Sequence, residues 1–249
     1  MSLRRREMPR DDTREEEMSL TGIRSELEAL SNPADAQFLQ RFFKTGPGQY
    51  GEGDLFRGIR VPVLRQLVRK HAAIPVADAA KLVESAYHED RLLALLMLVR
   101  LFKRGDDAAQ KQIHVLYLSN TRYINNWDHV DSSAEHIVGG YLSGRSKAPL
   151  TKLARSRILW ERRIAIIATF HFIRQGEFDE TLRIARILLH DEHDLMHKAV
   201  GWMLREVGNR EPEVEREFLR EHYREMPRTM LRYAIEKFPE AERKSFLRK

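Results

Sequence analysis

The sequence predicts an all-α protein, a right-handed α-α superhelix that curves around a basic concave face. Three observations predict it. No stretch alternates in hydropathy like a strand, whereas apolar residues recur at helical spacing throughout. Two apolar segments, 91–105 and 162–176, align without a gap. Similar helices begin at 127 and 197, so the four starts are spaced 36, 35 and 35 residues (127 − 91, 162 − 127 and 197 − 162).

This repetition concerns pairs of helices. Arg91 corresponds to Arg162, and Gly105 corresponds to Gly176. A less apolar helix is expected before each repeat start, and a helical pair that recurs every ~35 to 45 residues is typical of HEAT, armadillo or tetratricopeptide solenoids. Because the second helix of each pair is the more apolar, we expect the second helices to line the inner, concave layer. The expected first helices contain residues 76–83, 109–118, 150–157 and 180–189.

Local signals place the other boundaries. Asn32 followed by Pro33 predicts a capped helix start, and Pro62 predicts another. The glycine-rich segment 46–53 lacks the G-K-[ST] ending of a phosphate-binding loop, so we expect a connector there. Residues 1–18 are read as a mobile charged tail, and 19–249 as a single HEAT-like helical-repeat domain. Glycines stand where helices are expected to stop, at Gly105, Gly144 and Gly176.

Composition narrows the classes of function. The chain has no cysteine, which excludes disulfides, thiolate catalysis and cysteine zinc sites. No apolar run reaches the ~20 residues of a membrane span, so we expect no membrane and a cytoplasmic location. The first twenty residues carry five arginines and six acidic residues, so of the net charge of +6 the remainder carries +7. That excess suits a polyanion such as nucleic acid, and it equally suits a solubilising surface.

Aromatic and charged residues recur near the starts of three successive second helices. Trp127 and Asp131 are four residues apart and share one helix face. Arg163 is expected in the first turn of the next second helix, and Lys198, with Trp202 a turn further, in the one after. Each residue has a simpler explanation, since tryptophan is usually core and an aspartate such as Asp128 favours a helix start. Because these residues occupy equivalent positions in successive repeats, we expect them to form one site. The free N–H groups at the helix N-termini would favour binding of a phosphate there.

These segments resemble the DNA alkylation repair enzymes of the AlkD-like type, which are helical-repeat DNA glycosylases. The resemblance extends from about Asn32 to Tyr233, and Phe42 stands where the family can show a tyrosine. It rests on G-I-R-V-P-V-L-R-Q-L at 58–67, N-N-W-D-H-V-D at 125–131, W-E-R-R-I-A-I at 160–166 and H-K-A-V-G-W-M-L-R-E at 197–206.

The resemblance implies a hydrolase that cleaves the N-glycosidic bond of N3- or N7-alkylated purines, such as 3-methyladenine and 7-methylguanine, in double-stranded DNA. It implies that the base is not flipped out. The sequence itself indicates no metal or other cofactor. A monomer is expected. The implied catalytic residues are Asp131, Trp127 and Trp202, and the implied DNA-binding residue is Arg163. Lys198 and Arg205 are further candidates for binding DNA phosphates.

Two alternatives remain beside this interpretation. A non-catalytic helical-repeat module that binds DNA or an acidic protein has the same composition and repeat length. A module that only binds phosphates would gain nothing from an inward-facing carboxylate. The position of Asp131, equivalent in the repeat to those of the tryptophans, therefore favours the interpretation as an enzyme. The segment H-D-L-M-H at 193–197 approaches the H-E-x-x-H zinc motif, but an aspartate replaces the glutamate. We interpret it as a helix start.

Overall fold

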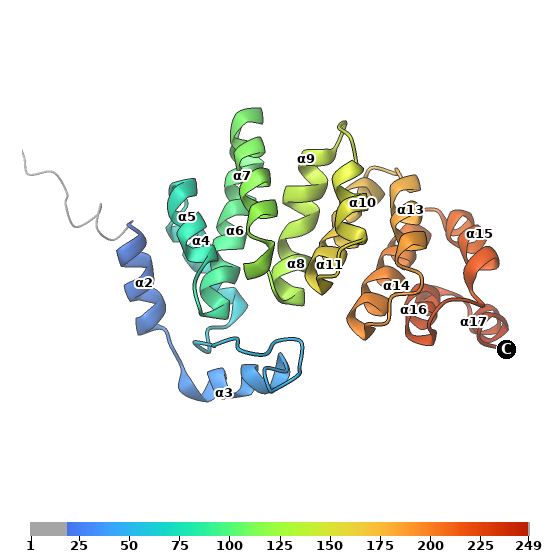
Figure 1. Ribbon diagram of the computed structural model, residues 1–249, viewed down its shortest axis with the longest axis horizontal. Coiled ribbons are helices and arrows are strands. Elements are labelled where there is room, and N and C mark those ends of the chain that lie inside the picture. The colour runs from blue at the N-terminus through green and yellow to red at the C-terminus, as the bar shows by residue number, and fades with distance from the viewer. Residues whose placement is uncertain (1–18, 249) are drawn as a thin grey trace, which may run out of the picture. The chain divides into compact units, whose positions relative to one another are not determined.

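The computed structural model describes residues 19–248 (Figure 1). The all-α prediction is confirmed: in these residues every regular element is helical, and the only strand-like feature is an isolated bridge between Leu55 and Tyr87. The predicted charged tail, residues 1–18, lies outside the described residues. None of the described helices has the length and apolar character needed to cross a membrane.

The chain divides into two compact units, Met1–Arg100 and Leu101–Lys249. The prediction of one domain from residue 19 stays a prediction. The first unit contains α2 (Leu20–Ala29), α3 (Pro33–Phe42), α4 (Val61–Lys70), α5 (Val76–Val83) and most of α6 (His88–Arg104).

In the first unit, a buried carboxylate holds the segment that leads into α4. Glu89, in the first turn of α6, accepts hydrogen bonds from the backbone N–H groups of Arg57 (2.9 Å), Gly58 (2.8 Å) and Ile59 (3.1 Å). Gly58 has a φ of 82°, and a Cβ at this position would lie 2.1 Å from the carbonyl oxygen of Asn32. Only glycine fits this turn. Asn32 caps α3, as predicted, by accepting from the N–H of Ala34.

The second unit carries every predicted site residue, and its helices pack in chain order. The second helices of the pairs contact one another successively, α8 with α11, α11 with α14, and α14 with α16. The first helices α10 and α13 pack against α11 and α14, their partners in each pair (Figure 1). The handedness, the curvature and the basic concave face of the predicted superhelix stay predictions. The elements are α7 (Asp107–Ser119), η1 (Thr121–Tyr123), α8 (Trp127–Ala134), the π-helical turn η2 (Glu135–Gly139), α9 (Gly140–Leu142), α10 (Ala148–Ala154), α11 (Leu159–Ala168), α12 (Phe170–Arg174), α13 (Asp179–Ile187), α14 (Asp194–Gly208), α15 (Pro212–His222), α16 (Arg228–Ala234), η3 (Ile235–Lys237) and α17 (Glu240–Leu247).

Three of the four second helices begin three residues earlier than the repeat predicted, and one of them is α6, which begins at His88 rather than 91. α11 begins at Leu159 rather than 162, and α14 begins at Asp194 rather than 197. The start of α14 is fixed by His193, whose Nδ1 accepts a hydrogen bond from the N–H of Leu195 at 3.1 Å. Of the four second helices, α8 alone begins at the predicted residue, 127. Arg163 and Lys198 consequently lie a full turn inside their helices.

Glycine permits a close approach between α11 and η2, the helical turn that follows α8. A Cβ on Gly139 would lie 2.2 Å from the carbonyl oxygen of Ala168, which is backbone and cannot rotate away. On the next residue, Gly140, a Cβ would meet only side chains, the ring of Phe102 at 3.1 Å and the ring of His171 at 3.8 Å. The end of η2 therefore packs on α11 at a distance that no other residue allows.

We predict that Gly139→Ala lowers the free energy of unfolding by about 1–3 kcal/mol, because the added methyl group forces η2 away from α11. Gly140→Ala is the matched control and should cost less, since an aromatic side chain can shift. Urea unfolding followed by circular dichroism measures both. Equal stability of the two variants would contradict the packing described here.

A buried carboxyl group lies between α14 and α15. Glu215 is 1% exposed, and its Oε1 has no hydrogen-bond partner among the described residues. A Cβ on Gly208 would collide with this side chain. Burial raises the pKa of Glu215 from 4.5 to about 8, although the nearby Arg216 and Arg205 act in the opposite direction.

The raised pKa of Glu215 makes the protein less stable as the pH rises from about 4.5 to about 8. In this window the folded protein keeps a proton that the unfolded chain releases, which costs about 1.4 kcal/mol per pH unit. Glu215→Gln should remove this slope. Thermal unfolding should show the variant more stable than the wild type at pH 8 and nearly equal at pH 4.5. Glu217→Gln, an exposed change on the same helix, should leave the slope unchanged.

Candidate active site

The start of α8 places Trp127 at the tip of the helix. Asn126, which is fully buried, caps the helix by accepting a hydrogen bond from the N–H of Trp127 at 2.8 Å. Trp127 is half-buried. Asp128 follows in the first turn, the helix-start position that the sequence predicted for it. Asp131 comes one turn after Trp127 and so lies on the same face of α8.

The carboxylate of Asp131 is held by Arg163 of α11. The guanidinium donates from Nε to Oδ1 and from Nη2 to Oδ2, both at 2.8 Å, which is a bidentate ion pair. The Nη1 of Arg163 also donates to the carbonyl oxygen of Leu195, in the first turn of α14, at 2.7 Å. A single side chain therefore joins three successive second helices, α8, α11 and α14.

This ion pair is largely withdrawn from water. The side chain of Arg163 is 6% exposed and that of Asp131 is 19% exposed. Burial raises the pKa of Asp131 above the ordinary value of an aspartate, while the charge and the hydrogen bonds of Arg163 act to lower it. The geometry of the pair, with both oxygens accepting from the guanidinium, requires an ionised carboxylate.

Trp202 lies just past the middle of α14 and is half-buried. Its indole Nε1 donates to Oε1 of Glu206 at 3.2 Å. The ring of Phe170, from α12, meets it edge-on with the ring centroids 6.0 Å apart. Trp202 therefore has a partner for its N–H group and another for its ring, both within the second unit.

The predicted DNA-binding residues all have carboxylate partners in this structure. Arg163 binds Asp131, Lys198 binds Asp194 of its own helix at 2.7 Å, and Arg205 pairs with Glu236. Arg163 is the most buried of the three. Their role on DNA stays a prediction, and a phosphate would have to compete with these carboxylates.

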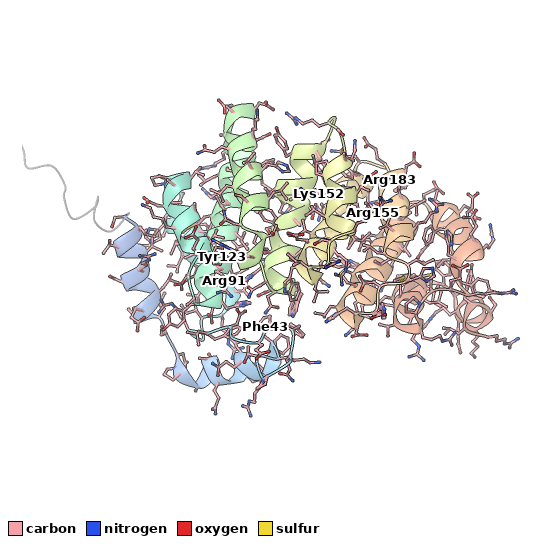
Figure 2. All side chains as sticks on the ribbon, viewed as in Figure 1. Phe43, Arg91, Tyr123, Lys152, Arg155 and Arg183 are labelled. Carbon is pink, nitrogen blue, oxygen red and sulfur yellow. The ribbon has the colours of Figure 1, made fainter. Side chains whose placement is uncertain are left out.

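Basic residues also occur on the first helices of the pairs. Figure 2 shows Lys152 and Arg155 at α10 and Arg183 on α13, and these two helices contact each other. Lys152 and Arg155 are exposed, whereas Arg183 pairs with Glu180 of its own helix. The positive charge of the second unit is therefore spread over both layers of helices.

Sequence analysis missed the residues that surround Trp202. Phe170, Glu206 and Arg210 contact the indole or its partners, and none was singled out. The signal for Glu206 was present, because it follows Trp202 by four residues and so faces the same side of α14. Phe170 gave no such signal, since it lies between Thr169 and His171 in a mostly apolar segment whose other members include buried residues.

The histidines of H-D-L-M-H have structural partners. His193 caps α14, and Nε2 of His197 contacts the carbonyl oxygen of Asp191. The neighbouring His190 is exposed and lies 3.6 Å from Glu225. The predicted helix start is thus present at this segment.

Comparison with known proteins places the chain in a family. Residues 23–238 match the family model described as DNA alkylation repair enzyme. The chain belongs to the DNA alkylation repair enzyme family. Its fold is similar to that of a predicted DNA alkylation repair enzyme from Enterococcus faecalis, with a TM-score of 0.64 and 16% identity over 84% of this chain and 97% of that one. No curated protein matches the chain.

Membership supports an enzymatic role for this DNA alkylation repair protein, acting on alkylated bases in DNA. The motifs that suggested the resemblance, from 58–67 to 197–206, all fall inside the matched residues. The family match extends across both compact units.

We predict that Arg163→Met in this DNA alkylation repair protein lowers the free energy of unfolding at pH 7 by about 3 kcal/mol, because Asp131 keeps a buried charge without its cation. The pKa of Asp131 should rise further in the variant. A carboxyl group whose pKa is higher in the folded state than in the unfolded state lowers stability only at pH values above its pKa in the unfolded state. The loss of stability in Arg163→Met should therefore be smaller near pH 4 than at pH 7. Urea unfolding at both pH values measures this.

The neighbouring arginine supplies the control for this prediction. Arg162 pairs with Asp191 instead, and Arg162→Met should leave the pKa of Asp131, measured by NMR titration, unchanged. A shift of the same size in both variants would show that the pair with Arg163 is not what controls Asp131.

Proposed function

We propose that this protein is a DNA glycosylase that hydrolyses the N-glycosidic bond of positively charged N3- and N7-alkylated purines in double-stranded DNA. The observation that carries the proposal is the carboxylate of Asp131, which Arg163 fixes one turn from Trp127 on the same face of α8. Family membership supports alkylated DNA as the substrate class.

A single fixed carboxylate matches the chemistry of such lesions. Ordinary glycoside hydrolysis uses two carboxyl groups, one of them to protonate the leaving group. A purine alkylated at N3 or N7 already carries a positive charge, so it leaves as a neutral base without a general acid. The sugar then develops positive charge, and Asp131 stabilises that charge electrostatically and orients the attacking water. No metal or other cofactor is required by this scheme.

The two tryptophans have a complementary role in the proposal. The faces of Trp127 and Trp202 attract the partly positive C–H groups of the deoxyribose, and the bulk of their rings excludes water. Both are half-buried, so part of each indole remains accessible. The protein recognises the DNA through its sugar-phosphate backbone, and the damaged base stays stacked in the duplex. The protein acts as a monomer.

The three basic residues divide into two roles. Arg163 is buried and bidentate on Asp131, which supports a role in positioning that carboxylate, beside the phosphate contact that the sequence predicted. Lys198 and Arg205 are assigned to phosphates. Their carboxylate partners Asp194 and Glu236 are both exposed, so exchanging such a carboxylate for a phosphate costs little.

The proposal is tested by base release from duplex DNA that contains 7-methylguanine or 3-methyladenine. We expect the wild type to release the base and Asp131→Asn to lose the rate by about a hundredfold or more, because the charge is removed while the shape is kept. DNA affinity should remain. Asp128→Asn is the matched control and should retain most of the rate.

Two results would count against the proposal. No release of either base by the wild type, with tight DNA binding intact, would favour the non-catalytic helical-repeat module. Equal losses in Asp128→Asn and Asp131→Asn would show that the reaction does not distinguish the two carboxylates.

A further inference from the structure

We propose that Glu206 is a positioning residue that fixes the orientation of the Trp202 indole, and that it does so by accepting a hydrogen bond rather than by its charge. The inference rests on the proposed function, since it concerns the ring assigned to the deoxyribose. It assigns a role to a carboxylate that does not take part in the chemistry proposed for Asp131.

The three residues involved form one line along α14 and its end. Trp202, Glu206 and Arg210 follow one another at intervals of four residues, so they lie on one face. The indole Nε1 donates to Oε1 of Glu206 at 3.2 Å. Arg210 donates from Nη1 to Oε2 of Glu206 at 2.9 Å, and also to the carbonyl oxygen of Glu206 at 2.9 Å. The carboxylate is thus held from one side by Arg210 and bonds the indole from the other.

Phe170 limits the movement of the same indole from a neighbouring helix. Its ring is edge-on to Trp202, with an interplanar angle of 60°. Two guanidinium groups lie over the ring of Phe170, Arg174 at 4.5 Å and Arg210 at 5.6 Å. Arg174 is in turn anchored on Glu135 at 2.8 Å. Arg210 therefore contacts both partners of Trp202, the carboxylate and the phenyl ring.

The hydrogen bond from Trp202 to Glu206 selects one orientation of the indole among those that packing against Phe170 would allow. An edge-on contact between two rings restrains their separation but tolerates rotation of the indole about its own side-chain bonds. The indole N–H is a donor with no acceptor capacity, so a rotation that leaves Glu206 must find another acceptor. Glu206 is 18% exposed in its side chain, so few water molecules can take its place.

The carboxylate charge of Glu206 is already compensated in this arrangement. Arg210 binds it directly, with its Nη1 2.9 Å from Oε2 of Glu206. A glutamine amide keeps one acceptor oxygen for the indole N–H, and Arg210 retains its hydrogen bond to the backbone carbonyl oxygen of the same residue, so Glu206→Gln should keep the orientation of Trp202. Glu206→Leu has a similar volume but no acceptor, and it should release the ring.

The hydrogen bond is tested without any reaction by NMR of protein labelled with 15N-tryptophan. The chain has three tryptophans, and Trp202→Phe identifies the signal of Trp202. We expect the indole proton of Trp202 to move upfield in Glu206→Leu and to keep its place in Glu206→Gln. The signals of the other two tryptophans should stay unchanged. An unmoved Trp202 signal in Glu206→Leu would overturn the inference.

The functional part is tested by single-turnover base release from duplex DNA containing 7-methylguanine. We expect Glu206→Leu to lower the chemical rate by about ten- to a hundredfold with little change in DNA affinity, because a misplaced group affects the transition state more than binding. Glu206→Gln should restore the rate to within about threefold of the wild type. Glu217→Leu, the same change on the exposed part of α15, is the control for leucine substitution.

The outcomes separate this inference from the proposed function. Absence of base release by the wild type overturns the proposed function. A wild type that releases the base, together with an unchanged rate in Glu206→Leu, overturns only the inference. If Glu206→Gln loses as much rate as Glu206→Leu while its indole signal is unmoved, Glu206 acts through its charge, and the positioning role is wrong.

Discussion

The ion pair between Arg163 and Asp131 is the interaction on which the rest of the candidate site depends. It joins α8 to α11, and the further hydrogen bond to the carbonyl oxygen of Leu195 joins both to α14. A buried bidentate pair has little freedom to rotate, because each donor that leaves an oxygen exposes a buried charge. The relative positions of the helices that carry Trp127, Asp131 and Trp202 are therefore coupled to one guanidinium group.

Pairing with Arg163 fixes the position of the Asp131 carboxylate, but it also weakens the attraction of that carboxylate for a cation. A carboxylate paired with arginine attracts a nearby cation less than a free one would, since the two charges largely cancel at a distance. At short range the cancellation is incomplete, and a group in contact with Asp131 experiences the carboxylate more than the guanidinium behind it. The site thus favours a positive charge that forms next to the oxygens over a cation that approaches from solvent.

Local features of this structure were accessible from the sequence, and pairings between distant residues were not. The start of α8 at Trp127, the cap at Asn32 and the shared face of Trp127 and Asp131 follow from spacing and residue type alone. The partner of Arg163 does not, because Arg162 is adjacent and chemically identical. The fold separates them, with Arg162 on Asp191 and Arg163 on Asp131.

Helix boundaries were the other feature that the sequence left open. The earlier starts of α11 and α14 depend on residues before the repeat, and the cap on α14 comes from His193, a residue type with no strong capping preference. The close approach of Gly139, the last residue of the π-helical turn η2, to Ala168 was equally absent from the sequence pattern. Such contacts are properties of the packed molecule and leave no periodic signal along the chain.

The late start of α8 has a consequence for access to the site. α11 and α14 each begin three residues ahead of the repeat position, at 159 and 194 instead of 162 and 197, whereas α8 begins on it. Three residues of α-helix are about 4.5 Å long. A turn of that length added before Trp127 would run past the indole and continue the helix beyond it. Its omission leaves Trp127 as the first residue of α8, so that no turn of this helix precedes the indole, whereas Arg163 and Lys198 each follow a full turn of their own helices.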